Sequence, residues 1–241
     1  MGRILNTLVA PDAHRNFSKA LAKFAQKARE IIKGYSDYCI YAGGDDVLAL
    51  LPLETVIECA NALNKAFRQH LQGFQLPDDS GTLSIGVAIC HRMEPPSIAL
   101  EAARSAERAA KQLRNALAVA VHPRSGSSVM VKDPWRDTLL QDWQNSKKAL
   151  RHGIARGFPY ELQHLARQWE GAISHPNFSP RQKRELPKRL KKEALRILER
   201  KKETGQNTKA IMEEVIDSIQ SVDQLKTQAD RLAIAHFLTR G

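Results

Sequence analysis

Two adjacent carboxylates, Asp45 and Asp46, stand directly after two glycines, Gly43 and Gly44, and this segment has the clearest chemical potential. Two neighbouring carboxylates repel each other when both are ionised, unless they share a cation. Hard oxygen ligands at an exposed turn suit Mg²⁺ or Mn²⁺, whose coordination is commonly completed by nucleotide phosphates. Glycine lets a phosphate approach the backbone, and metals held in this way can activate a hydroxyl and stabilise a leaving pyrophosphate. The alternative is a solvated turn, because turns are rich in Gly and Asp.

A β-hairpin is expected to carry this segment. Residues 35–42 are rich in aromatic and apolar side chains and residues 47–51 are apolar, and a short Gly/Asp segment between two such runs is typical of a hairpin. Apolar side chains elsewhere recur at helical spacing or alternate as in strands. The further elements predicted up to residue 121 are helices over 12–33, 53–72 and 95–113 and strands over 83–89 and 116–121. This order predicts a helix-covered mixed sheet that contains one hairpin.

The composition changes near residue 123, and the chain after it is expected to be entirely helical. The helices predicted there cover residues 134–151, 158–174, 181–202, 208–218 and 222–238. Ser221, followed three residues later by Gln224, is typical of the N-terminal cap of a helix. The fold class is therefore expected to be α+β, with one domain over residues 1–130 and a helical bundle over residues 131–241.

The net charge of +11 is concentrated in one segment. Residues 1–130 carry 15 Lys/Arg and 12 Asp/Glu, whereas residues 181–202 alone carry 11 Lys/Arg and 3 Asp/Glu. Such a local excess points to an acidic partner more than a generally basic composition does. The cations that recur every four residues in this segment are Arg184, Lys188, Lys192, Arg196 and Arg200. They indicate contact with RNA phosphates or with an acidic subunit, and the alternative is a solvated helix face.

The sequence lacks the features of membrane, secreted or disulfide-linked proteins. The longest apolar runs, such as residues 47–51, are too short to cross a bilayer, and the first residues contain no apolar signal region. Cys39, Cys59 and Cys90 stand far apart without a CxxC motif, which disfavours a disulfide framework and a cysteine-based zinc site. We therefore expect a reducing, cytoplasmic compartment.

Residues 41–52, Tyr-Ala-Gly-Gly-Asp-Asp-Val-Leu-Ala-Leu-Leu-Pro, resemble the catalytic palm hairpin of the large subunit of type III CRISPR–Cas effector complexes. The resemblance covers most of residues 12–125 in the same order, and its segments are most similar to the Cmr-type (subtype B) branch. The helical part from Pro134 onward resembles the C-terminal bundle of that subunit. The segments that carry the resemblance besides the hairpin are residues 13–21, 83–89, 107–111 and 114–119.

In that family, the palm with the GGDD motif converts ATP into cyclic oligoadenylates when target RNA binds, and these second messengers act in antiviral defence. The resemblance implies a partial ferredoxin-like palm of the nucleotidyl cyclase and polymerase type, followed by an all-α helical bundle. It implies that Asp45 and Asp46 bind Mg²⁺ or Mn²⁺, and that both glycines of the motif, Ser84 and Lys111 lie close to the ATP substrate. The implied partners are guide RNA, target RNA and other subunits of the complex, including a small helical subunit.

Several features of the family are absent from this sequence. It contains no adjacent His-Asp pair of the family's nuclease motif, no set of zinc cysteines and no first palm. The strand that should open the GGDD palm is expected to be missing, because residues 4–9 could form a short strand but offer no carboxylate. Leu113 replaces the glycine usually found before the Arg-Asn pair. We therefore expect a C-terminal piece of a larger subunit, from a split or truncated gene, that is inactive alone.

Two other functions stay open. A truncated palm with its bundle could be a non-catalytic scaffold that docks guide RNA and partner subunits; the missing strand favours this function and the GGDD segment does not. Diguanylate cyclases share the palm fold and a GG[DE]EF hairpin. Here Asp46 and Val47 stand in place of the Glu-Phe pair of those enzymes, and no sensor module precedes the hairpin.

Overall fold

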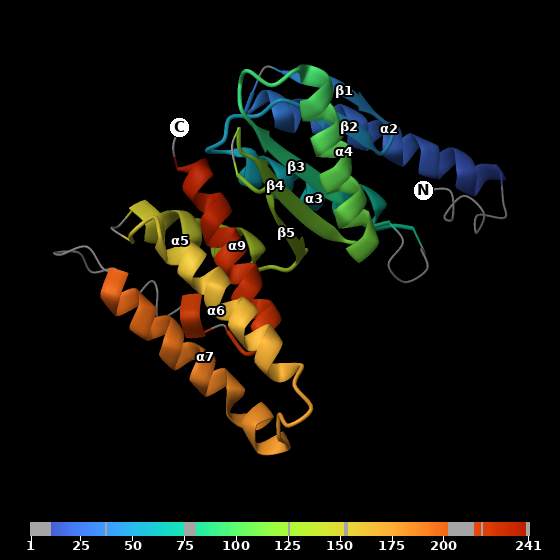
Figure 1. Cartoon of the computed structure of the whole chain (residues 1–241). Coiled ribbons are helices and arrows are strands. Elements are labelled where there is room, and N and C mark those ends of the chain that lie inside the picture. The colour runs from blue at the N-terminus through green and yellow to red at the C-terminus, as the bar shows by residue number, and fades with distance from the viewer. Residues whose placement is uncertain are drawn as a thin grey trace. The chain divides into compact units, whose positions relative to one another are not determined.

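The computed structural model is an α+β structure, in which a region with two small sheets is followed by a helical region (Figure 1). This confirms the predicted fold class. The chain forms two compact units, one of residues 1–119 with 132–140 and the other of residues 120–131 with 141–241. The structure describes residues 11–36, 38–74, 81–124, 126–151, 154–201, 215–217 and 219–239.

Helices α2 (Pro11–Lys33) and α3 (Val56–Leu71) pack against each other and form the main core of the first unit. The ring of Phe24 on α2 meets the ring of Phe67 on α3 edge-on, with 4.9 Å between the ring centroids. Phe17 meets Phe74 in the same way at 5.4 Å. Because these apolar side chains recur at helical spacing, both helices could be predicted from the sequence.

The predicted hairpin is present as strands β1 (Cys39–Gly43) and β2 (Asp46–Ala49), which pair antiparallel. Gly43 lies opposite Asp46, so the connecting turn contains two residues, Gly44 and Asp45. Gly44 has a φ of +61°, and Asp45 is not among the described residues with positive φ. A positive φ at the first turn residue alone is the pattern of type II′ hairpins, which require glycine there.

The second sheet contains strands β3 (Ile85–Cys90), β4 (Ala116–His122) and β5 (Val129–Pro134) in that spatial order. The prediction of one mixed sheet was therefore wrong, because the hairpin forms a separate two-stranded sheet. Within the described residues no strand joins the two sheets. The short strand considered for residues 4–9 lies outside the described residues.

Strand β5 also corrects the prediction that only helices follow residue 123. Its alternating signal is limited to Val129 and Val131, because the next buried position of the strand holds the charged residue Asp133. The helix expected over residues 134–151 begins instead at Leu139.

Helix α4 (Pro96–Leu113) packs tightly against β3 (Figure 1). Its buried face consists of alanines spaced four residues apart, Ala102, Ala106 and Ala110. Small side chains at this spacing let the helix backbone approach the strand. The closest approach is at Gly86, where an added Cβ would lie 2.6 Å from the Cα of Glu107.

The turn between α4 and β4 is strained. Arg114 and Asn115 follow each other with φ values of 57° and 41°, a region that L side chains rarely adopt. The backbone N–H of Trp135 donates to the carbonyl oxygen of Asn115 at 2.8 Å. The indole N–H of the same tryptophan donates to the carbonyl of Leu83, also at 2.8 Å. These two hydrogen bonds tie the turn to the start of β3.

The helical region contains α5 (Leu139–Arg151), α6 (Phe158–Ile173), α7 (Pro180–Lys201) and α9 (Val222–Leu238). Helices α6, α7 and α9 bury apolar side chains in a common core. The predicted cap of the last helix is confirmed, because the Ser221 hydroxyl accepts a hydrogen bond of 3.1 Å from the backbone N–H of Gln224. Most of the helix expected over residues 208–218 lies outside the described residues. No described helix is both long and apolar enough to span a bilayer.

The contact at Gly86 leads to a prediction about stability. Gly86→Ala should lower the free energy of unfolding by about 1–3 kcal/mol, because the new methyl group would overpack the β3–α4 contact. Gly73→Ala is the matched control, since nothing lies within 4 Å of its added Cβ, and it should change stability by no more than about 0.5 kcal/mol. Urea denaturation measures both. Equal stability of the two variants would contradict the close packing.

Candidate functional site

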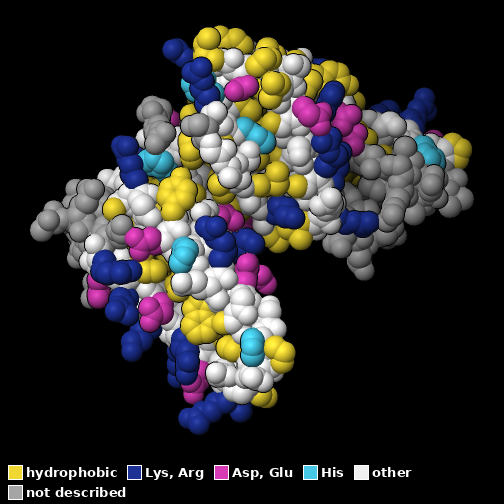
Figure 2. Space-filling model, in the orientation of Figure 1, with side chains coloured by type: hydrophobic (Ala, Val, Ile, Leu, Met, Phe, Trp, Pro, Cys, Tyr) yellow, Lys and Arg dark blue, Asp and Glu magenta, His cyan; other side chains and the backbone are white. Residues whose placement is uncertain are grey.

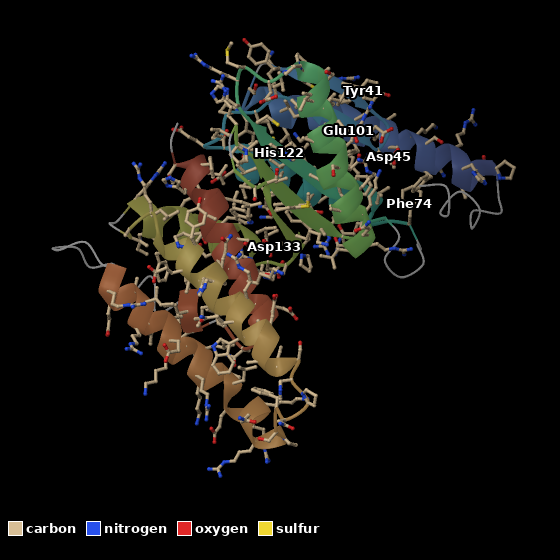
Figure 3. The ribbon with its side chains drawn as sticks, in the orientation of Figure 1. Tyr41, Asp45, Phe74, Glu101, His122 and Asp133 are labelled. Atoms are coloured by element: carbon tan, nitrogen blue, oxygen red, sulfur yellow. The ribbon has the colours of Figure 1, made fainter. Side chains whose placement is uncertain are left out.

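The hairpin tip presents both carboxylates of the GGDD motif. Asp46 is exposed and Asp45 is half-buried, and Figure 3 shows Asp45 at this hairpin. An added Cβ at Gly44 would meet nothing within 4 Å, so space alone would allow a side chain there. Glycine is required because the backbone at Gly44 has a positive φ. Gly43 differs, because an added Cβ would lie 2.8 Å from Cζ of Tyr41. The phenol of Tyr41 therefore already lies over the backbone at Gly43.

Two side-chain hydrogen bonds from outside the hairpin hold its strands in place. The guanidinium of Arg29 on α2 donates to the carbonyl oxygen of Ala42, one residue before the motif. The Ser36 hydroxyl donates to the carbonyl of Leu50, beyond the far end of β2, at 2.8 Å. Helix α2 therefore supports the strand that leads into the GGDD turn.

Lys111, near the end of α4, lies within electrostatic range of the hairpin tip. Its ammonium group pairs with Glu107 one turn earlier, at 2.5 Å. The hydrogen bond with Glu107 is the largest cause that raises the pKa of Lys111, partial burial opposes it, and the charges of Glu107, Asp46 and Asp45 add to the rise. The fold thus brings a cation near two carboxylates that stand more than sixty residues earlier.

Ser84 lies one residue before β3 and is half-buried. The hydrogen-bonded neighbour of β3 is β4 and not the hairpin. Ser84 is therefore placed beside the second sheet, next to Leu83, whose carbonyl accepts the Trp135 indole hydrogen bond.

The donor set at the hairpin tip suits a metal that also binds a substrate. Among the described residues there is no group of three or more His, Cys, Asp or Glu side chains that could hold a metal ion. Mg²⁺ commonly binds to one or two carboxylates and completes its shell with waters and substrate phosphates, so Asp45 and Asp46 fit such an ion. The three cysteines are free, and burial raises the pKa of Cys59 to about 11.

The basic helix α7 carries acidic residues that neutralise part of its charge (Figure 2). Glu185 pairs with both Arg181 and Arg189, at 3.4 and 3.0 Å. Arg200 pairs with Glu161 on α6 at 3.4 Å, and Arg196 reaches Glu193 only at 3.9 Å. The exposed cations of the predicted row that have no acidic partner in the described part of the chain are Arg184, Lys188 and Lys192.

The fold and the hairpin define a palm-like α+β region followed by helices, and comparison with known proteins identifies the palm. Residues 1–118 match the family model of Cas10/Cmr2, second palm domain, and belong to that family. This confirms the resemblance found in the sequence.

Two curated relatives are similar to this chain. The CRISPR system Cmr subunit Cmr2 of Pyrococcus furiosus is 34% identical over 169 residues, which are 66% of this chain and 19% of the relative. The CRISPR system CMR subunit Cmr2 of Saccharolobus solfataricus is 38% identical over 66 residues, which are 27% of this chain and 6% of the relative. The chain therefore spans less than a fifth of the length of these relatives.

Sequence reasoning missed two residues of the site, Arg29 and Tyr41. Arg29 lies on the polar face of α2, whereas only the apolar residues of this helix predict its packing. Its hydrogen bond with Ala42 joins residues thirteen positions apart in the chain. Tyr41 was recognised as part of the motif but assigned no role. An aromatic side chain two residues before the first glycine of the motif was the available signal.

The surroundings of Lys111 lead to a prediction about its pKa. Asp45→Asn combined with Asp46→Asn should lower the pKa of Lys111, because a nearby negative charge favours the ammonium form. Glu107→Gln alone should lower the pKa of Lys111 by more than the double aspartate change does, since the hydrogen bond with Glu107 is the largest cause of the rise. NMR titration of the Lys111 side-chain carbon next to the amine measures both shifts. The reverse order of the two shifts would show that Glu107 is not the main partner.

Proposed function

We propose that this palm is part of a type III CRISPR–Cas effector large subunit and, in the complete complex, converts ATP into cyclic oligoadenylates when target RNA binds. The observation that carries the proposal is the pair of carboxylates on a type II′ hairpin, with the ammonium of Lys111 in electrostatic range. The match of residues 1–118 to the Cas10/Cmr2 second palm domain supports the assignment to an effector large subunit. The relatives are named as subunits of a CRISPR system, and we propose the same setting for this chain.

The residues at the hairpin tip have separate roles in the proposed reaction. Asp45 and Asp46 would hold Mg²⁺ or Mn²⁺, and the bound metal would lower the barrier by activating a hydroxyl and by neutralising charge on the pyrophosphate. Gly44, which carries no side chain, leaves the turn open to a nucleotide. Lys111 would offer a cation to the phosphates, and its hydrogen bond with Glu107 and the charges of Glu107, Asp46 and Asp45 raise its pKa.

The proposed partners are other subunits of the complex, including a small helical one, together with guide RNA and target RNA. The feature that supports an RNA contact is the row Arg184, Lys188, Lys192 and Arg196 on α7. Three of these cations have no acidic partner in the described chain, and the fourth has only a distant one. Arg200 belongs to the same predicted row, but its pair with Glu161 makes it a weaker candidate.

A second candidate function is a non-catalytic scaffold. It is favoured by the small number of acidic ligands, because the described residues offer only two carboxylates at the hairpin and no third ligand beside them. A scaffold would dock RNA and subunits without turning over ATP. The experiment that follows separates the two functions.

Asp45→Ala combined with Asp46→Ala should abolish oligoadenylate synthesis by the assembled effector complex that contains this chain, because the metal would lose both protein ligands. Stability should change by only about 0.5 kcal/mol, since the tip is exposed. Radiolabelled ATP and separation of the products measure synthesis.

The matched control for this experiment is Asp137→Ala combined with Glu199→Ala. Both residues are exposed and lie outside the hairpin, so the control removes the same charge. Full synthesis by the Asp45/Asp46 variant would contradict the catalytic role. Absence of synthesis from the unmutated complex, with normal RNA docking, would support the scaffold instead.

The α7 row leads to a separate prediction about RNA affinity. Lys188→Gln, Lys192→Gln and Arg196→Gln together should weaken RNA binding and reduce the slope of log affinity against log salt by up to about 2, at roughly 0.7 per lost phosphate contact. The helix should persist, because Gln is nearly as good a helix former as Lys or Arg. Fluorescence anisotropy at several salt concentrations measures the slope. Unchanged affinity and slope would mean that this row is only a solvated face.

A further inference from the structure

A second row of cations lies on α2, in the other compact unit. Arg15, Lys19, Lys23 and Lys27 stand four residues apart, and all four are exposed. Four residues exceed one helical turn by only about 40°, so the row winds slowly along one side of the helix. The buried residues of α2 lie on the opposite side and are Phe17, Phe24, Ala25, Ala28 and Ile32.

The charges of this row are largely unneutralised. Lys27 pairs with Glu30 at 3.0 Å. The side chains of Arg15, Lys19 and Lys23 make no hydrogen bond or ion pair within the described part of the chain. Like charges four residues apart on a helix repel each other, so the row destabilises α2 unless something else binds to it. Helix α7 differs, because Glu185 there joins two arginines of the same helix.

The spacing of the row matches a chain of phosphates. Four residues of α-helix rise about 6 Å, so the four cations span about 18 Å. The phosphates of one stacked nucleic-acid strand advance about 3.4 Å each along the axis. A single strand that runs along the helix would therefore place roughly every second phosphate beside a cation.

The side chains between the cations favour nucleic acid over protein as the partner. The exposed neighbours are Asn16, Ser18, Ala22 and Gln26, which are small or polar. The cores of protein interfaces are instead enriched in aromatic side chains and depleted of charged ones. Without an exposed aromatic ring in the row, bases could not stack on it, so contact would be limited to the phosphates.

We propose that the row Arg15, Lys19, Lys23 and Lys27 on α2 binds the phosphates of a single RNA strand without base selectivity. The row is separate from α7 and from the hairpin carboxylates. Only the choice of RNA over another single strand rests on the proposed function. Binding to the row needs no ATP, so loss of oligoadenylate synthesis and loss of RNA binding at α2 are distinguishable.

The test uses the full chain in which Lys188→Gln, Lys192→Gln and Arg196→Gln have removed the α7 contribution. In this background, Arg15→Gln, Lys19→Gln and Lys23→Gln together should weaken binding of a labelled oligouridylate. They should also reduce the salt slope by about 2, at roughly 0.7 for each phosphate contact. An oligoadenylate of the same length should give the same loss, because phosphate contacts carry no base information.

The matched control is Lys65→Gln, Arg68→Gln and Arg92→Gln, three exposed cations outside the row. This control removes the same charge from a different part of the surface. If the row is the binding surface, the control should retain most of the RNA affinity and of the salt slope. The charge-preserving changes Lys19→Arg and Lys23→Arg should retain binding. Circular dichroism checks that each variant is folded, and single changes at Lys19 or Lys23 replace the triple variant if it is not.

Two results would overturn the proposal. The first is equal RNA affinity and slope for the row variant and its control. The second is binding of polyglutamate to the row together with no binding of oligouridylate and no competition between the two. The partner would then be an acidic protein surface.

Discussion

Two negative charges held on adjacent residues at a hairpin tip are the constraint on which the candidate site depends. The two-residue turn places Asp45 and Asp46 side by side in the chain, and Gly44 adopts the positive φ that a type II′ turn requires at its first position. Hydrogen bonds from Arg29 and Ser36 then hold the strands on either side. Helix α4 brings the cation of Lys111 within electrostatic range of the two carboxylates.

The position of Lys111 depends on packing far from the charges. Helix α4 can lie close to β3 because its buried face is alanine and because Gly86 has no side chain. The strained turn at Arg114 and Asn115 follows directly after α4, and tertiary hydrogen bonds from Trp135 compensate for it. Local strain beside a candidate site is common where the surrounding structure fixes the geometry. The electrostatics of the hairpin thus rest on a helix–strand contact made by alanines, a glycine and the backbone of Glu107.

The sequence was sufficient for features that depend on local periodicity and insufficient for those that depend on tertiary contacts. The hairpin, α2, α3 and the Ser221 cap were predicted because their apolar spacing and turn residues lie within short windows. Strand β5 was missed because a charged residue, Asp133, occupies one of its buried positions. Its pairing partner β4 defines the strand more than its own sequence does. The contact of Arg29 with Ala42 could not be predicted, since it depends on how α2 crosses the hairpin. Lys111 came from the family resemblance alone.

The hydrogen bond from Arg29 also bears on how the chain behaves in concentrated solution. Among the described residues strand β1 is paired only with β2, and β1 carries the exposed apolar side chains Ile40 and Tyr41. An open edge with apolar side chains is a template for pairing with strands of other molecules. Arg29 occupies the carbonyl of Ala42 on this strand and places a charge beside it. The side chain that supports the strand before the GGDD turn therefore also blunts an open strand edge, as charged residues on the edges of natural sheets do.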